Sequence, residues 1–218
     1  MEMKKILSGM IKTMDAVKPP RMTALRELHE AETGPFSILI GTILSARTKD
    51  EATAKAVKVL FSKYKNPKEL ASAKIKDVEK IIKSIGFFHV KSKRIIEVAR
   101  IIDTKYKGKV PDDLETLVQL PGVGRKTANC VLVYAYEKPA IPVDIHVHRI
   151  SNRLGLVETK NPEETEQELM KKIQKKYWLD INDTFVMYGQ NICKPISPMC
   201  DVCKIKKSCK YYKSKNAS

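Results

Sequence analysis

Lys126 and Asp144 are the two side chains of this sequence that are best suited to covalent chemistry. Lys126 follows a glycine-rich turn at residues 122–125 and stands at the start of a predicted helix over residues 125–136. The positive end of a helix dipole is expected to lower the pKa of an amine there, which leaves more of it neutral and nucleophilic. A neutral lysine can attack the anomeric carbon of a sugar and form a Schiff base. The carboxylate of Asp144 can stabilise the cationic sugar that develops and assist proton transfer.

The turn before Lys126 is suited to binding phosphate. Pro121 cannot continue the helix predicted over residues 112–120, and Gly122 and Gly124 allow a positive φ and a close approach of another backbone. Backbone N–H groups at the start of the next helix bind anions, most naturally a phosphate. A plain helix–turn–helix connection with a solvated lysine is the structural alternative. The phosphate-binding interpretation covers Gly122, Val123, Gly124 and Arg125.

Asp144 and the histidines that follow it also allow a purely structural interpretation. Asp144 precedes an apolar helical pattern over residues 145–154, so it can serve simply as the N-cap of that helix. His146 and His148 suggest a metal pair. Residues two apart do not share a helix face, however, so we expect no metal site there.

Four of the five cysteines lie close together and suggest a metal centre. Four thiolates can hold zinc or ligate an iron–sulfur cluster, and the spacing by itself leaves both open. Two disulfides in so short a segment are disfavoured in an intracellular chain. The fifth, Cys130, lies on the apolar face of a predicted helix and is expected to be a buried thiol. The clustered cysteines, with Lys194 among the lysines around them, are Cys193, Cys200, Cys203 and Cys209.

The charge of the chain points to a polyanionic partner. The formal net charge of its 218 residues is +16, and it is concentrated in residues 85–110 and 190–218. DNA or RNA is favoured over an anionic membrane surface, although general surface solubility remains an alternative. The longest nearly apolar run, residues 36–46, is too short to span a bilayer. We see no secretory signal and expect an intracellular protein.

The sequence predicts an almost entirely helical protein, because apolar residues recur with helical spacing and few runs alternate with period two. Short loops rich in Gly, Pro and Asn separate the helices. The lysine-rich tail from Lys210 is expected to be disordered. Helices are predicted over residues 4–17, 23–31, 35–44, 50–61, 67–72, 75–84, 89–105, 112–120, 125–136, 145–154, 162–173 and 182–192.

Three motifs together resemble the endonuclease III branch of the helix–hairpin–helix DNA glycosylases. Residues 120–128 resemble the helix–hairpin–helix of that superfamily, and residues 143–147 resemble its aspartate loop. The spacing of the four clustered cysteines matches the iron–sulfur motif of this branch. The resemblance extends from about Phe36 to Cys209, with the motifs in family order.

The resemblance implies an all-α fold of two lobes with the DNA site in the cleft between them. One lobe is a six-helix barrel that carries the helix–hairpin–helix, here residues 28–138. The other lobe combines residues 1–27 with residues 139–218. It implies a 4Fe–4S cluster on Cys193, Cys200, Cys203 and Cys209, with zinc as the less favoured alternative.

The resemblance also assigns roles to individual residues. The catalytic lysine of the family falls on Lys126 and its aspartate on Asp144. Monofunctional members lack this lysine, so its presence implies a bifunctional glycosylase and abasic-site lyase. Such an enzyme flips the target nucleotide out of duplex DNA, removes an oxidised pyrimidine, and cuts the strand 3′ to the abasic site by β-elimination. The implied partner is double-stranded DNA that holds damaged bases or abasic sites, with no membrane partner and a monomeric enzyme.

The chain departs from the family at two positions that are expected to enter the DNA. Arg47 stands where bacterial members have a glutamine that fills the gap left by the flipped base. Phe87 stands in place of a leucine wedge. An arginine can donate hydrogen bonds to an orphaned base and a phenylalanine can stack. For Phe87, packing in the protein core is the competing interpretation.

Two other functions remain open from the sequence. One is a mismatch or purine-lesion DNA glycosylase of the same superfamily. The other is a non-catalytic module that uses the hairpin only to grip phosphates, which would bind DNA with strong salt dependence and no turnover.

Overall fold

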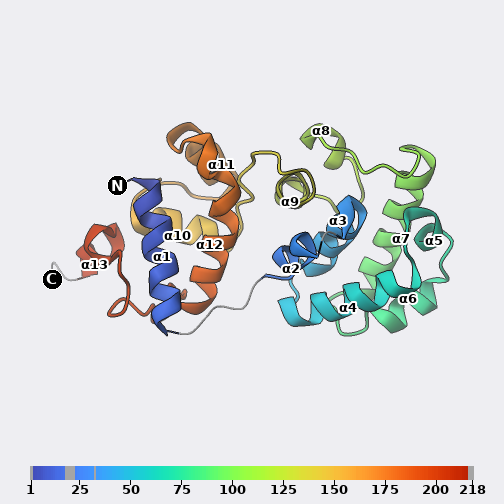
Figure 1. Ribbon diagram of the computed structural model, residues 1–218, viewed down its shortest axis with the longest axis horizontal. Coiled ribbons are helices and arrows are strands. Elements are labelled where there is room, and N and C mark those ends of the chain that lie inside the picture. Colours follow the sequence, from blue (N-terminus) through green and yellow to red (C-terminus); the bar gives the residue numbers. More distant parts are fainter. Residues whose placement is uncertain (1, 18–22, 32, 216–218) are drawn as a thin grey trace. The chain divides into compact units, whose positions relative to one another are not determined.

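The computed structural model describes residues 2–17, 23–31 and 33–215. Within these residues the secondary structure is helical and contains no strand (Figure 1), which confirms the all-α prediction. The chain divides into two compact units, one of Ala24–Lys138 and one of Met1–Thr23 with Pro139–Ser218. None of the described helices is both long enough and apolar enough to cross a bilayer.

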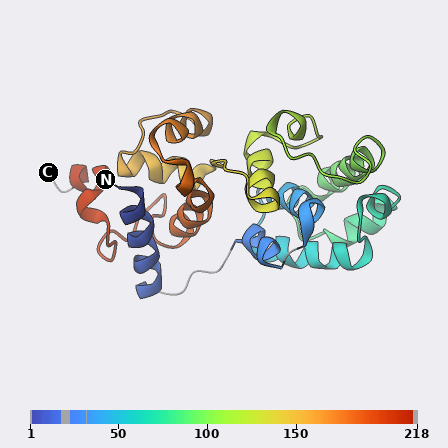
Figure 2. The ribbon, with the colours of Figure 1, turned by 45° about the horizontal axis from the view of Figure 1, so that its top comes forward.

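The unit Ala24–Lys138 is built around one buried helix, α3 (Gly34–Ser45), in which every residue from Ser37 to Leu44 is buried. This helix is apolar on nearly all sides, which is the pattern of a helix covered by others. It contacts four of its neighbours, and Figure 2 shows α9 lying alongside it. The other helices of the unit are α2 (Ala24–Glu30), α4 (Asp50–Lys63), α5 (Pro67–Ala71), α6 (Ile75–Ile81), α7 (Phe88–Thr104), α8 (Leu114–Leu117) and α9 (Arg125–Tyr136).

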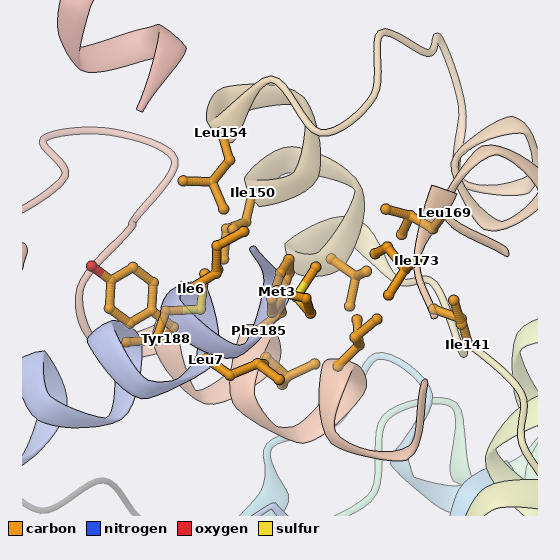
Figure 3. Packing of buried hydrophobic residues seen from close by; sticks show 14 of the residues in the cluster. Met3, Ile6, Leu7, Ile141, Ile150, Leu154, Leu169, Ile173, Phe185 and Tyr188 are labelled. Atoms are coloured by element: carbon orange, nitrogen blue, oxygen red, sulfur yellow. The ribbon is translucent and has the colours of Figure 1, made fainter. Parts of the chain in front are cut away.

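The other unit packs the first helix of the chain against the last third of it. Figure 3 shows Met3, Ile6 and Leu7 of α1 (Met3–Val17) among apolar side chains from α10 (Ile145–Leu154) and α12 (Trp178–Asn191). Phe185 is fully buried at this contact. The remaining elements are α11 (Pro162–Lys172), η1 (Lys175–Tyr177), η2 (Lys206–Ser208) and α13 (Lys210–Lys215).

Three segments differ from the sequence prediction by four or more residues. The helix predicted over residues 112–120 is the single turn α8, because Asp113 caps it and bonds of the i→i+3 type tighten the chain up to Leu120. Helix α12 begins at Trp178, four residues earlier than predicted, and the indole of Trp178 donates to the carbonyl of Ile173 at 3.0 Å.

The prediction of a disordered tail from Lys210 is wrong for the residues up to Lys215, which form α13. Lys210 Nζ pairs with Glu158 Oε2 at 3.1 Å, and the guanidinium of Arg153 lies 4.5 Å from the ring centre of Tyr211. These contacts hold the short helix against the rest of its unit. Its high lysine content had suggested disorder instead. The last part of that prediction, residues 216–218, lies outside the described residues.

Candidate functional site

Of the two glycines in the turn between α8 and α9, only Gly122 has the positive φ that the sequence suggested. Gly122 adopts φ +75°, and the amide of Val123 donates to the carbonyl of Leu120 at 3.0 Å. Gly124 is the N-cap of α9 with φ −90°, so it needs no left-handed backbone. A Cβ at Gly124 would meet nothing within 4 Å, whereas one at Gly122 would lie 2.8 Å from Cδ of Arg94. The start of α9 is therefore open where a ligand backbone can approach it.

Lys126 is the second residue of α9 and its side chain is partly buried. Its neighbour Arg125 is exposed, while Val123 is buried at 5% exposure, so the side chain of Val123 is not available to a ligand. The N-cap residue of this helix is Gly124, which has no side chain that could cap its first amides. A helix start whose N-cap is a glycine is suited to a phosphate. Cys130 of the same helix is fully buried, as the sequence predicts.

Asp144 begins α10 as its N-cap. Its Oδ1 accepts hydrogen bonds from the amides of His146 and Val147, at 2.8 and 2.9 Å. The carboxylate is partly exposed, and its Oδ2 accepts no hydrogen bond from the part of the chain that the structure describes. The structural interpretation of Asp144 is thus correct, and it leaves one carboxylate oxygen available for a substrate.

The two histidines of this segment contact separate partners. His146 Nδ1 lies 3.1 Å from Nη2 of Arg149, and His148 Nδ1 lies 2.7 Å from Oγ1 of Thr165. Their ring nitrogens are therefore directed to different neighbours within the unit.

The four clustered cysteines line one cavity in the unit that contains α10 and α12, with Ile150, Tyr188 and Tyr211 among the other lining residues. All four are free thiols and partly buried. Burial raises the pKa of the Cys200 thiol, and the three other cysteine sulfurs add to this shift. Burial likewise raises the pKa of the Cys209 thiol. The four sulfurs thus lie close enough to affect one another, and a bound cation would offset their mutual repulsion.

The cysteine arrangement is not that of a preformed site for a single ion. Among the described residues, no three potential ligands are placed so that they could hold one metal ion. The hydroxyl of Tyr188 donates to Sγ of Cys203 at 2.9 Å, and its pKa is raised mainly by burial. The donor set, four thiols around one largely apolar cavity, fits either an iron–sulfur cluster or zinc in its chemistry.

Two arginines of α10 that the sequence analysis overlooked hold the cysteine segment. Nη2 of Arg149 donates to the carbonyls of Gly189 and Cys193, at 3.1 and 2.9 Å. Nη1 of Arg153 donates to the carbonyl of Lys194 at 2.7 Å, while the side chain of Lys194 is exposed. The signal was available, because Arg149 and Arg153 are four residues apart and so share one helix face.

Arg47 and Phe87 occupy two loops that lie against each other in the unit Ala24–Lys138. Both residues have left-handed backbones, with φ +53° and +58°. Both side chains are exposed, Phe87 by 63%, so core packing of Phe87 is wrong. The amide of Gly86 donates to Oγ1 of Thr48 at 3.2 Å, which joins the loops although they are 38 residues apart in the sequence.

Lys91 is a further residue that the sequence analysis did not single out. It is only 5% exposed, and its ammonium reaches the loop that contains Arg47. Its position on α7 gave a signal, because Lys91 falls on the same apolar stripe as Ile95, Val98 and Ile102. A lysine on a buried stripe requires an internal partner.

Comparison with known proteins agrees with these features. A family profile described as HhH-GPD superfamily base excision DNA repair protein matches residues 40–175. The chain is 52% identical over 185 residues to endonuclease III of Thermotoga maritima, covering 85% of this chain and 87% of the relative. It is 35% identical to endonuclease III of Escherichia coli K12, covering 87% and 93% of the two chains.

Solved structures give the same result. A structure of an endonuclease III in a non-covalent complex with DNA superposes with a TM-score of 0.84 and 34% identity, covering 99% of this chain and 97% of that one. A trapped covalent intermediate of endonuclease III with DNA superposes with a TM-score of 0.82 and 35% identity, covering 97% and 96%. The chain therefore belongs to the endonuclease III family of the HhH-GPD superfamily of base excision DNA repair proteins.

Proposed function

We propose that Lys126 and Asp144 carry out base excision and strand cleavage in this protein. As a member of the endonuclease III family, the protein is a bifunctional DNA glycosylase and abasic-site lyase for oxidised pyrimidines. DNA is its substrate, in line with the DNA complexes of related endonucleases III. The observation that carries the residue assignment is a lysine in the first turn of α9, directly after an N-cap that leaves the helix start open.

The first part of the reaction belongs to Lys126. Its neutral amine attacks C1′ of the flipped nucleotide, the bond from C1′ to the base breaks, and the base leaves with the bonding electrons and takes up a proton. Opening of the sugar ring gives an imine between Nζ and C1′. Loss of a C2′ proton then expels the 3′ phosphate, which cuts the strand. The glycine N-cap of α9 and the open space beside it support this role, because a backbone phosphate can approach the helix start next to the lysine.

The second role belongs to Asp144. Its Oδ1 is held by two backbone amides, so the carboxylate is fixed in orientation. A fixed anion stabilises positive charge on the sugar without having to reorganise during the reaction. Oδ2 is the atom that we assign to this interaction and to receiving the proton that Lys126 releases.

Borohydride trapping tests the role of Lys126. The parent protein, incubated with a duplex that contains thymine glycol, should give a covalent complex and a nicked strand. Lys126→Gln should form no complex, whereas Lys68→Gln, which removes an exposed lysine of α5, should trap as the parent does. Equal trapping by Lys126→Gln and the parent would refute the assignment.

A panel of lesions tests the substrate class. Duplexes with thymine glycol or 5-hydroxyuracil should be cut in preference to duplexes with 8-oxoguanine or a G·T mismatch. Preference for 8-oxoguanine or G·T would instead support the alternative of a purine-lesion or mismatch glycosylase. Tight, salt-sensitive binding without cleavage of any duplex would support a non-catalytic module.

We further propose that Cys193, Cys200, Cys203 and Cys209 hold a 4Fe–4S cluster. When bound, the cluster would tie the segment of residues 193–209 together through four thiolates. The shared cavity of the four thiols supports this proposal, as does membership of the family. Metal analysis of anaerobically prepared protein should find about four irons per chain, with absorption in the visible range. Stoichiometric zinc without iron would overturn it.

The remaining site assignments are proposals about DNA contact. The backbone of Gly122 to Arg125 contacts phosphates, Arg47 and Phe87 enter the duplex, and Lys194 contacts the DNA from the cysteine segment. Their exposure supports these roles, apart from the buried side chain of Val123. We also propose that residues 28–138 form the barrel domain, that residues 1–27 with 139–218 form the iron–sulfur domain, and that the enzyme acts as a monomer inside the cell.

A further inference from the structure

Lys91 is a buried cation whose three donors bond to the end of α3 and to the loop that follows it. Its Nζ donates to the carbonyls of Leu44 and Ala46, at 2.7 and 2.6 Å, and to Oγ1 of Thr48 at 3.1 Å. An ammonium has three N–H donors, so these three acceptors satisfy it fully. Leu44 lies in the last turn of α3, where exposed carbonyls give a partial negative charge. The ammonium therefore closes the end of α3 and fixes the loop that contains Arg47.

The same contacts reach the loop that contains Phe87. Thr48 accepts from Lys91 and also from the amide of Gly86 at 3.2 Å. The two loops are so close that a Cβ at Gly86 would lie 2.9 Å from the carbonyl oxygen of Arg47. The hydroxyl of Thr48 thus links the ammonium of Lys91 to the loop that contains Phe87.

Arg47 and Phe87 are adjacent in the sequence to the residues that make these contacts, and their backbones are strained. A left-handed backbone is energetically unfavourable at a residue other than glycine, and both residues have one. Such conformations persist only where surrounding contacts determine them. The contacts here are the bonds of Lys91 and Thr48, while the Arg47 and Phe87 side chains themselves point away from the core and are exposed.

The cation is also held at a cost. Burial lowers the pKa of Lys91 to about 8, and the nearby charge of Arg94 adds to the shift. Its three bonded partners are neutral oxygens rather than carboxylates. A methionine of similar length would fill the same space without this penalty. The three hydrogen bonds of Lys91 therefore fix the geometry of the loop at a cost in stability.

We propose that Lys91 is a positioning residue that holds Arg47 and Phe87 together as one two-pronged element for entry into duplex DNA. This inference rests on the proposed DNA-entry role of the two exposed residues. It does not depend on the roles of Lys126 or Asp144. Lys91 itself touches no substrate, because it is buried beneath the loops.

Lys91→Met tests the proposal with Lys93→Met as the matched control, since Lys93 is an exposed lysine of the same helix. We expect Lys91→Met to lower single-turnover excision of thymine glycol from duplex DNA by roughly 10- to 100-fold. Cleavage of an abasic site in a single strand, which needs no duplex entry, should stay within about two-fold of the parent. Parental excision, or equal loss on both substrates, would overturn the proposal.

A second readout needs no turnover. Insertion should unstack a 2-aminopurine placed opposite a tetrahydrofuran abasic analogue and raise its fluorescence, in the parent and in Lys93→Met but much less in Lys91→Met. Hydrogen exchange should be faster in residues 44–48 and 85–88 of Lys91→Met. If the parent protein excised no lesion, the proposed function would be refuted. The fluorescence comparison would still test the role of Lys91, because it does not depend on excision.

Thr48→Val covers the case in which Lys91→Met does not fold. This variant removes the hydroxyl that joins Lys91 to Gly86 and leaves the two carbonyl bonds of Lys91 in place. It should also lower the fluorescence signal and the rate of duplex excision, but by less than Lys91→Met does. Parental behaviour of Thr48→Val on both measures would refute the coupling of the two loops.

Discussion

Helices α9 and α10 begin in opposite ways. Helix α9 begins at Gly124, which offers its amides no side-chain cap and leaves open space where a Cβ would stand. Helix α10 begins at Asp144, whose own Oδ1 accepts from two of its amides. The N-cap of the first helix has no acceptor of its own, which suits an anion from outside the protein, whereas the second helix already holds its own anion.

This difference suits the two roles that we propose. A phosphate of DNA can complete the start of α9, which places the strand next to Lys126. At α10 no phosphate is needed, and the bonded carboxylate is fixed for use on the sugar. A helix start can therefore serve binding or electrostatic stabilisation, depending on whether the N-cap residue has an acceptor of its own.

The largest expected effect separates the charge of Asp144 from its capping. Asp144→Asn keeps an oxygen that can accept from His146 and Val147, so the protein should remain folded. Loss of the negative charge should lower base excision by roughly 100- to 1,000-fold. Single-turnover rates with a thymine glycol duplex and thermal unfolding together measure both effects. Parental excision rates would reduce Asp144 to a helix cap.

Asp144→Ala sharpens the same comparison. It removes charge and cap together, so it should add a loss of about 1 kcal/mol of folding stability to the catalytic loss. Denaturant unfolding of the Asn and Ala variants measures this difference. Equal stability of the two variants would show that Oδ1 contributes nothing to the start of α10.

The two glycines of the hairpin should respond differently to alanine. Gly122→Ala places a Cβ on a left-handed backbone and 2.8 Å from Cδ of Arg94, which must move. We expect a loss of about 1–2 kcal/mol of stability, measured by denaturant unfolding. Gly124→Ala, at φ −90° with open space around it, should stay within about 0.5 kcal/mol of the parent.

Gly124→Ala should instead weaken DNA binding. The added methyl group occupies the open side of the α9 start, where we place a phosphate, so affinity should fall by about 10-fold. Titration of an abasic-analogue duplex at several salt concentrations measures the effect. Unchanged affinity would mean that no phosphate approaches this helix start.

The remaining prediction concerns the other kind of helix end, the carboxyl end of α3, which Lys91 closes with a cation. The pKa of Lys91 is about 8 in the folded protein, against an ordinary value of 10.5. At a pH between these two pKa values the unfolded chain binds more protons than the folded one, so the free energy of unfolding rises with pH. The slope is at most about 1.4 kcal/mol per pH unit.

Lys91→Met has no such titration. The free energy of unfolding of the parent, minus that of Lys91→Met, should therefore increase from pH 8 to pH 10 and be flat below pH 8. Urea unfolding at a series of pH values measures it. A difference that falls with pH would contradict burial as the cause of the lowered pKa.

The sequence predicts helices best where their ends carry clear signals. Helices α9 and α10 have the predicted bounds, because Gly124 and Asp144 mark their starts and both segments have a regular apolar stripe. Helix α13 was missed, since its stability comes from contacts of Lys210 and Tyr211 with residues more than fifty positions away. Periodicity in a short lysine-rich segment contains no trace of such contacts.

The candidate site was predictable to the extent that motifs are local. The hairpin turn, Asp144 and the four cysteines could be read from spacing and from the family resemblance. The joining of the Arg47 and Phe87 loops could not, because it depends on the hydroxyl of Thr48 and an ammonium 43 residues further along. The left-handed backbones at these two positions were equally hidden, since neither is a glycine or an asparagine.

The bonds that join these two loops have a consequence for the search for damage. The conformational entropy of ordering Arg47 and Phe87 is lost once, when the protein folds, and not again at each encounter with DNA. An enzyme that samples very many intact base pairs for each damaged one repeats that encounter constantly. Preorganised loops let each trial insertion begin and end quickly. The time that the enzyme spends at a base pair then depends on whether the base is intact or damaged.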